Sequence, residues 1–175
     1  MRTLLLLREA IYNPKLHPLD EAQRPITPRG KMDALHLGEI LLERELFPEL
    51  VLISPTLRSM QTMEAIRSRN RYIGIVQPLD ALLNADGGMI MDAISQLSDQ
   101  VRQVMLVSNM PGLKQVLAVL TGWNKSLPTS TLAYIAVSIN KWDEICLPQL
   151  EASLVELWHL SRIPDGSYRG FFNAL

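Results

Sequence analysis

The stretch Leu4-Leu5-Leu6-Leu7-Arg8-Glu9-Ala10 is the part of the sequence that decides the fold. Four leucines in a row, without polar alternation, are typical of a central parallel strand that helices cover on both faces. The run ends abruptly in an arginine and a glutamate. Because ligands of open α/β sheets bind outside the carboxyl ends of the strands, Arg8 and Glu9 stand where a functional site is expected.

The following residues repeat this pattern of buried strand and amphipathic helix. Thr27 is the expected N-cap of the first helix, Pro28 suits its first position, and Gly122 is a suitable stop for the last one. Apolar runs predict strands at 50–53, 72–76 and 104–107, and periodic patterns predict helices at 28–46, 56–68, 89–97 and 113–120.

The last third of the chain changes character. Residues 132–139 and 153–160 alternate between apolar and polar side chains with no clear helix between them, which indicates an antiparallel addition at one edge of the sheet. The second segment should be the last strand, with an irregular tail from Arg162. The element order predicts an α/β fold with a mostly parallel central sheet between helices, and no repeat or linker divides residues 1–175, so we expect a single domain.

Polar residues follow three of the predicted strands at the points where the strands end. They are Arg8 and Glu9 after the first strand, Ser54 to Arg58 after the second, and Ser108 and Asn109 after the fourth. The carboxyl ends of parallel strands meet at one edge of a sheet, so these side chains should converge on one rim. In a plainer interpretation, Arg8 and Glu9 are an ordinary charged strand end, Arg58 is an exposed helix residue, and Ser54 and Ser108 cap helices.

Composition excludes several classes of function. The chain has 175 residues, a net charge of −1 and 20% charged residues, which offers no basic surface for nucleic acid or an anionic membrane. No stretch has the length of a membrane span or a signal-peptide core, so we expect a cytoplasmic protein. The single Cys146 excludes an internal disulfide and a multi-cysteine zinc site, and we expect it to be buried. No acidic cluster indicates a metal, and no cofactor is expected.

Three blocks carry a resemblance to a known family. They are Arg24-Pro25-Ile26-Thr27-Pro28-Arg29-Gly30, the longer Ile53-Ser54-Pro55-Thr56-Leu57-Arg58-Ser59-Met60-Gln61-Thr62, and Leu127-Pro128-Thr129-Ser130-Thr131. In order and over nearly the whole chain, the sequence resembles the histidine phosphatase superfamily, specifically the SixA-type phosphohistidine phosphatases. The resemblance implies a three-layer α/β sandwich of the phosphoglycerate mutase type. It also implies that Arg8 and Arg58 occupy the family's phosphate-binding arginine positions.

Both catalytic histidines of the family are replaced. The family's Arg-His-Gly, whose histidine is the nucleophile, reads Arg8-Glu9-Ala10 here, and Asn109 stands in the place of the second histidine. Asp80 lies near the position of the family's proton donor but does not match the pattern, so that role is not assigned to it. Of the other histidines, we expect His36 on the polar side of its helix and His159 as a structural or edge residue, whereas the loop of His17 could fold over the rim.

These replacements change the chemistry that the rim can perform. A carboxylate about 4 Å from a phosphate charge costs on the order of 4 kcal/mol at an effective dielectric constant near 20. Glu9 could instead pair with Arg8 or Arg58 and hold the pocket shut. Asn109 can donate a hydrogen bond to an oxyanion but cannot carry an imidazolium's charge. We therefore expect catalysis by the histidine mechanism to be lost and phosphate affinity to be weakened.

Three functional hypotheses follow. The first is a catalytically degenerate SixA-like homologue that binds a phosphorylated small molecule or a protein. The second is an active phosphohydrolase, acting on a phosphoprotein or a small phosphomonoester, in which Glu9 or another residue supports a different mechanism, since a carboxylate can accept a phosphoryl group. Its motivation is the arginine pair Arg8 and Arg58, which has little structural reason to persist. The third is an unrelated doubly wound α/β domain whose motif matches are accidental.

Overall fold

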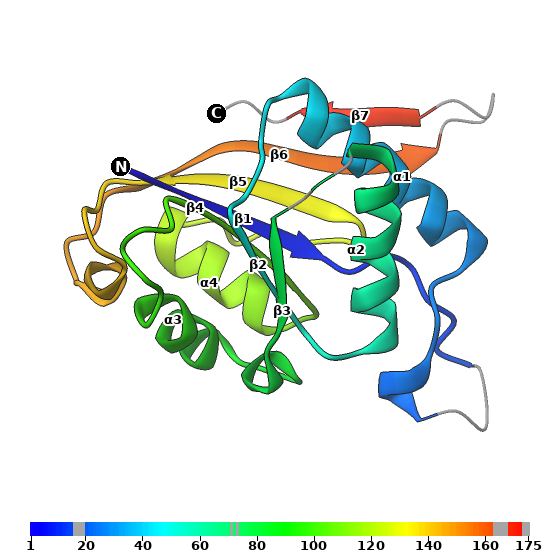
Figure 1. Ribbon diagram of the computed structural model, residues 1–175, viewed down its shortest axis with the longest axis horizontal. Coiled ribbons are helices and arrows are strands. Elements are labelled where there is room, and N and C mark those ends of the chain that lie inside the picture. Colours follow the sequence, from blue (N-terminus) through cyan, green and yellow to red (C-terminus); the bar gives the residue numbers. More distant parts are fainter. Residues whose placement is uncertain (16–19, 71, 73, 163–167, 173–175) are drawn as a thin grey trace.

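The computed structural model describes residues 1–15, 20–70, 72, 74–162 and 168–172. Among these residues, seven strands form one sheet in the order β3-β2-β4-β1-β5-β6-β7 (Figure 1). β1 to β4 are mutually parallel, whereas β5 pairs antiparallel with both β1 and β6, and β7 pairs antiparallel with β6. The strands are β1 (Arg2–Arg8), β2 (Leu50–Ile53), β3 (Ile75–Pro78), β4 (Gln103–Ser108), β5 (Thr131–Val137), β6 (Ala152–Arg162) and β7 (Tyr168–Phe172).

Helices cover both faces of the sheet, which confirms the predicted three-layer α/β architecture. α1 and α2 pack on one face, and α3, α4 and η3 pack on the other (Figure 1). None of the helices in the described part of the chain is long and apolar enough to cross a bilayer. The α-helices are α1 (Pro28–Glu43), α2 (Leu57–Asn70), α3 (Gly87–Ser95) and α4 (Gly112–Thr121), and the short 3-10 helices are η1 (Glu21–Gln23), η2 (Asp80–Leu82) and η3 (Trp142–Cys146).

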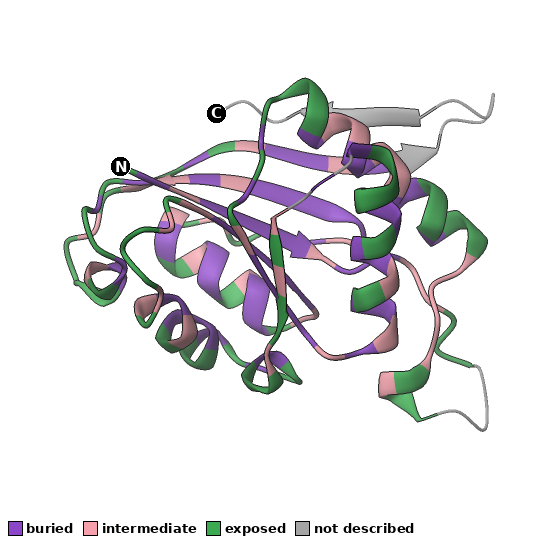
Figure 2. Cartoon of the chain, viewed as in Figure 1, coloured by how far each residue is buried: buried purple, intermediate pink, exposed green. Residues whose placement is uncertain are grey.

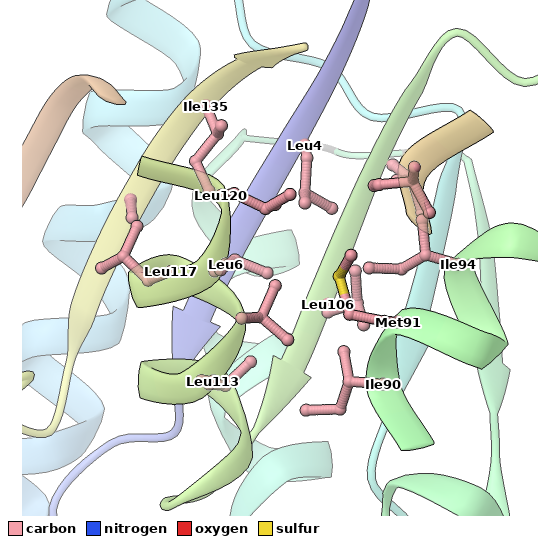
Figure 3. Packing of buried hydrophobic residues seen from close by; sticks show 14 of the residues in the cluster. Leu4, Leu6, Ile90, Met91, Ile94, Leu106, Leu113, Leu117, Leu120 and Ile135 are labelled. Atoms are coloured by element: carbon pink, nitrogen blue, oxygen red, sulfur yellow. The ribbon is translucent and has the colours of Figure 1, made fainter. Parts of the chain in front are cut away.

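The four leucines of β1 supply both halves of the core. Successive side chains of a strand point to opposite faces, so Leu4 and Leu6 pack toward α3 and α4, and Leu5 and Leu7 toward α1 and α2. Figure 3 shows Leu4 and Leu6 packed among side chains that include Leu113. All four leucines are fully buried, and Figure 2 shows buried residues along the central strands between the two helical layers. Burial on both faces explains why the run has no polar alternation.

The first and last predicted helix signals act as expected. The Thr27 hydroxyl accepts a hydrogen bond from the Gly30 amide at 3.0 Å, and Pro28 is the first residue of α1. Gly122 ends α4 with a φ of 73°, in the left-handed region that glycine enters without strain. A Cβ atom at Gly30 would lie 2.5 Å from the carbonyl oxygen of Ile11, so α1 can approach the segment after β1 only with a glycine there.

Several sequence predictions need correction. The third strand is Ile75–Pro78 rather than 72–76, because the Tyr72 amide donates to the Asn70 side chain in a turn instead of joining the ladder. Residues 153–160 are not in the last strand, since β7 follows, although part of the predicted irregular tail lies outside the described residues. Cys146 is exposed rather than buried because it ends η3 at the surface.

The register of the sheet brings the predicted strand ends to one edge. Arg8 of β1 lies beside Ser108 of β4, and Ile53 of β2 lies beside Val107 of the same strand. The segments that carry Glu9, Ser54 and Asn109 therefore leave the sheet side by side, and the predicted convergence on one rim is confirmed for the backbone.

The central position of β1 predicts which side chains carry the stability of the fold. We expect Leu6→Ala, at a fully buried position, to lower the free energy of unfolding by about 2–5 kcal/mol because it leaves a cavity. Val119→Ala, on the exposed side of α4, should change it by less than about 0.5 kcal/mol. Urea unfolding of both variants measures the difference, and equal effects would contradict this packing.

Candidate functional site

The backbone at Glu9 is held by hydrogen bonds from three directions. The Glu9 amide donates to the carbonyl of Ser108, which extends the pairing of β1 with β4 beyond the strand. The Glu9 carbonyl accepts a hydrogen bond from the Ser130 amide at 3.1 Å, just before β5. The next amide, that of Ala10, donates to the Thr62 hydroxyl of α2 at 3.0 Å. The backbone at Glu9 is therefore tied to the two neighbouring strands and to α2.

The Glu9 side chain points toward α2 and forms a buried ion pair with Arg58. One carboxylate oxygen accepts from Nε of Arg58, and the other accepts from the Ser59 hydroxyl at 2.8 Å. The Thr56 hydroxyl in turn donates to the Ser59 oxygen at 2.9 Å. Glu9 is 2% and Arg58 1% exposed, so both charges are removed from water. The sequence left open whether Glu9 pairs with Arg8 or Arg58, and the partner is Arg58.

The outer side of the Arg58 guanidinium is covered by the segment between β1 and α1. One terminal nitrogen of Arg58 donates to the carbonyl of Glu21 at 2.6 Å, and the other lies 3.5 Å from the Glu21 carboxylate. The ring of Tyr12 stacks over the guanidinium, with 4.5 Å between the Arg58 Cζ and the ring centroid. Every edge of the guanidinium thus meets protein, and the interpretation of Arg58 as an exposed helix residue is wrong.

The second motif block holds α2 against the segment that follows β1. Thr56 caps α2, because its hydroxyl accepts from the Ser59 amide at 3.3 Å. Gln61 accepts a hydrogen bond from the Ile26 amide at 2.9 Å, one turn beyond Arg58. Ser54 does not cap the helix, and its buried hydroxyl has no hydrogen-bond partner among the described residues. The polar side chains of this block therefore serve the packing between α2 and residues 9–26.

Arg8 points to the other side of the sheet rim. Its guanidinium donates to the carbonyl of Leu127, in the loop before β5. Burial lowers the pKa of Arg8 from its usual value, and the nearby Glu9 and Tyr12 partly oppose this shift. An arginine stays charged under such shifts. Arg8 therefore remains a half-buried cation that is tied to a backbone carbonyl.

Asn109 leaves the sheet beside Glu9 but contacts a different part of the chain. Its side-chain amide lies 3.5 Å from the Oδ1 of Asn84, at the limit of a hydrogen bond. Its own oxygen is buried and has no partner among the described residues. The preceding Ser108 donates from its hydroxyl to the carbonyl of Leu82 at 3.2 Å rather than capping α4. The backbones of Glu9 and Asn109 are neighbours, while their side chains bond to different elements.

The other candidate residues are distributed as follows. His36 lies on α1 with its ring nitrogen 2.8 Å from the Met32 carbonyl, and His159 lies on β6 near the Thr131 hydroxyl. Asp80 is exposed at the start of η2. His17 lies outside the described residues. Within the described part of the chain, no group of three histidine, cysteine or acidic side chains is arranged to hold a metal ion.

Solved structures with the same fold include proteins described as phosphohistidine phosphatases. A structure described as a phosphohistidine phosphatase SixA from Nakamurella multipartitia superposes with a TM-score of 0.77 at 20% identity, covering 90% of this chain and 95% of that one. The protein histidine phosphatase SixA complexed with tungstate gives a TM-score of 0.73 at 19% identity, covering 87% and 93%. The chain has the histidine phosphatase fold. This fold is of the phosphoglycerate mutase type, as the resemblance implied.

Two further comparisons leave the activity open. An α-ribazole-5′-phosphate phosphatase structure from Escherichia coli gives a TM-score of 0.67 at 17% identity, covering 88% of this chain and 95% of that one. A chloroplastic protein of Arabidopsis thaliana, itself uncharacterised, is 23% identical over 152 residues, which is 82% of this chain and 70% of that protein. No protein-family model matches the sequence.

Sequence reasoning missed the residues that cover the Arg58 guanidinium and one further buried carboxyl group. Tyr12 and Glu21 lie in a segment without periodic pattern, so no local signal marks them. Asp33, by contrast, sits on the apolar side of α1 next to Ala34, and its burial could have been predicted from the helical period. Burial raises the pKa of Asp33, and the nearby Arg29 and His36, together with the Ser130 hydroxyl, partly oppose the rise.

The buried ion pair predicts a large cost for removing one partner. We expect Arg58→Met to lower the free energy of unfolding by about 3–5 kcal/mol, because it leaves the Glu9 charge buried and unpaired. The double variant Glu9→Gln, Arg58→Met should recover much of that loss. Arg69→Met, in an exposed ion pair with Glu39, is the matched control and should cost less than about 1 kcal/mol. Denaturant unfolding measures all three, and an Arg58→Met variant as stable as the control would contradict the pair.

The raised pKa of Asp33 predicts how stability depends on pH. Folded protein binds this proton more tightly than the unfolded chain, so the free energy of unfolding should fall as pH rises from about 4 through the native pKa. Asp33→Asn should abolish this decline, whereas Asp92→Asn, at an exposed position, should leave it in place. Unfolding midpoints measured across this pH range test the prediction. If stability declined with pH as steeply in Asp33→Asn as in the wild type, Asp33 would not be the group responsible.

Proposed function

We propose that this chain is a SixA-like homologue that has lost the family's catalysis and acts by binding a protein. The observation that carries the proposal is the buried contact between the Glu9 carboxylate and Arg58. In the family that the sequence resembles, the arginine at this position serves the phosphoryl group. In this chain, the carboxylate of Glu9 already pairs with that arginine.

The hydrogen bonds of the Glu9 carboxylate support the proposal that Glu9 does not act as a nucleophile. Attack on phosphorus requires an oxygen or nitrogen lone pair that faces the substrate. One oxygen of Glu9 accepts from Arg58 and the other from Ser59, both in the buried layer between β1 and α2. A carboxylate engaged in this way is stabilised as an internal anion. The alternative of an active phosphohydrolase that uses Glu9 would require this network to open.

Two features support a weak affinity for phosphate: the negative charges near Arg58 and the cover over its guanidinium. A phosphate about 4 Å from the Glu9 carboxylate would be repelled by on the order of 4 kcal/mol, or about a thousandfold in affinity. Glu21 adds a second carboxylate next to the Arg58 guanidinium, and Tyr12 covers its face. Between the two binding modes that the sequence suggested, these contacts favour a protein partner over a phosphate ligand.

The retained arginines have structural partners, which weakens the main argument for an active enzyme. That argument holds that two such arginines would have little reason to persist without a phosphate substrate. Arg8 bonds to the Leu127 carbonyl, and Arg58 bonds to Glu9 and Glu21. Both arginines thereby connect segments that are distant in the sequence. Their presence is compatible with a protein that performs no phosphoryl transfer.

Turnover measurements test this proposal. We expect the purified protein to hydrolyse neither phosphohistidine nor an aryl phosphate above background, and Glu9→Gln to behave in the same way. Activity in the wild type that Glu9→Gln abolishes would overturn the proposal in favour of the phosphohydrolase. The double variant Glu9→His, Asn109→His should gain measurable vanadate binding, with Glu9→Gln, Asn109→Gln as the matched control. A folded double-histidine variant without vanadate binding would show that these two positions do not define the defect.

A further inference from the structure

A buried carboxyl group on α1 lies outside the contacts of the Glu9–Arg58 pair. Asp33 is 1% exposed, and burial is the main cause of its raised pKa. The Ser130 hydroxyl interacts with the Asp33 carboxyl group and favours its charged form. Ser130 is itself fully buried and directly precedes β5. This interaction therefore joins α1 to the loop that enters β5.

Ser130 also holds the rim through its backbone. Its amide donates to the carbonyl of Glu9 at 3.1 Å, so one residue connects Asp33 with the backbone that carries the Glu9 carboxylate. The φ of Ser130 is 57°, in the left-handed region, which a serine adopts at an energetic cost and keeps only where its surroundings hold it there. A change in what the Ser130 side chain contacts should therefore reach the Glu9 carbonyl.

The ionisable groups nearest to this interaction come from α1 and β6. Arg29 and His36, about one turn to either side of Asp33 on α1, favour its charged form, but burial outweighs them. On β6, His159 pairs with Thr131 across the strands, and its ring nitrogen lies 3.3 Å from the Thr131 hydroxyl. Burial and the nearby Arg29 both lower the pKa of His159. At neutral pH His159 is therefore uncharged and does not compensate for an ionised Asp33.

The other charged side chains that the structure describes on α2 and β6 are paired or exposed. The pairs are Arg58–Glu9, Arg69–Glu39 and Arg44–Glu156, and the exposed residues are Glu64 and Arg67. A carboxylate that is almost completely buried must gain water or additional donors when it ionises. Ser130 is the polar side chain that interacts with Asp33, so ionisation of Asp33 should act first on Ser130.

We propose that Asp33 and Ser130 form a proton-operated latch on the rim: protonated Asp33 keeps Ser130 and the Glu9 carbonyl together, and loss of the proton to solvent loosens them. The sign follows from linkage, because a carboxyl group whose pKa is raised in the closed form binds its proton more tightly there, and rising pH then favours the open form. The latch regulates the rim to which we assign partner binding, and it rests on that proposed function for its role but not for its chemistry.

An NMR titration of the whole protein tests the latch in the native state. We expect the carboxyl carbon of Asp33, the amide of Ser130 and the carbonyl carbon of Glu9 to titrate together, with one midpoint above about pH 4. Hydrogen exchange of the Ser130 amide, corrected for its intrinsic pH dependence, should become several-fold faster as pH rises through that midpoint. Asp33→Asn, which resembles the protonated carboxyl group in shape, should keep the Ser130 amide at its low-pH protection throughout.

Two further variants separate the latch from a general effect of mutation. Asp92→Asn, at an exposed position of α3, is the matched control and should titrate like the wild type. Ser130→Ala should leave Asp33 titrating while the Glu9 carbonyl no longer follows it. Because Asp33→Asn is expected to increase protection at neutral pH, a variant that merely destabilises the fold cannot produce the expected result.

Three results would overturn the latch. The first is a Ser130 amide that does not respond to pH, and the second is a response that persists in Asp33→Asn. The third is a Ser130 amide that exchanges only together with the amide of Leu6 in the central β1, since the tie would then open only when the whole protein unfolds. Phosphatase turnover is a separate measurement, and its detection would overturn the proposed function while leaving the latch intact.

Discussion

The ion pair between Glu9 and Arg58 is the constraint on which the rest of the site depends. Two opposite charges that are almost completely buried must stay together, because either alone would carry a large desolvation cost. The pair fixes the end of β1 against the first turn of α2. It also determines what the rim can bind, since the guanidinium that could meet an external oxyanion already meets an internal one. The same contact therefore bears on both the stability of the fold and the chemistry of the rim.

This arrangement gives the residues of the second motif block a structural role. Thr56 and Ser59 support the Glu9 carboxylate, Gln61 holds the Ile26 amide, and Thr62 holds the Ala10 amide. The bonds of Ser59, Gln61 and Thr62 link α2 to the segment after β1, and loss of any one would leave a polar group unpaired. Selection for a stable fold is therefore sufficient to keep the block. Resemblance in these residues supports a common fold more strongly than a common reaction.

Local patterns predicted the parts of the fold that local chemistry controls. The leucine run identified β1, and Thr27 with Pro28 located the start of α1 to the residue. The third strand was misplaced because the Asn70 side chain takes the Tyr72 amide out of the ladder, and the apolar pattern cannot show this. The exposure of Cys146 depends on how η3 sits on α3, which is a tertiary effect.

In the site, too, local patterns predicted some features, and tertiary contacts decided the others. Sequence placed Arg8, Glu9 and Arg58 on one rim but could not choose the partner of Glu9, since that depends on which face of the sheet its side chain takes after the strand ends. Glu9 continues the alternation of β1, in which Leu5 and Leu7 face α1 and α2, so it meets Arg58, while Arg8 turns to the opposite side. Tyr12 and Glu21 contact Arg58 from a segment whose sequence has no periodic pattern, so the sequence could not predict these contacts.

The most direct test of the central claim is an NMR titration of the Arg58 Nε–H resonance with tungstate. A guanidinium already paired with Glu9 and covered by Tyr12 should give a slowly exchanging signal that tungstate leaves unchanged, while exposed arginines such as Arg69 shift weakly and without saturation. A saturable shift of the Arg58 signal would show that an external oxyanion reaches the guanidinium, and it would contradict the closed pocket.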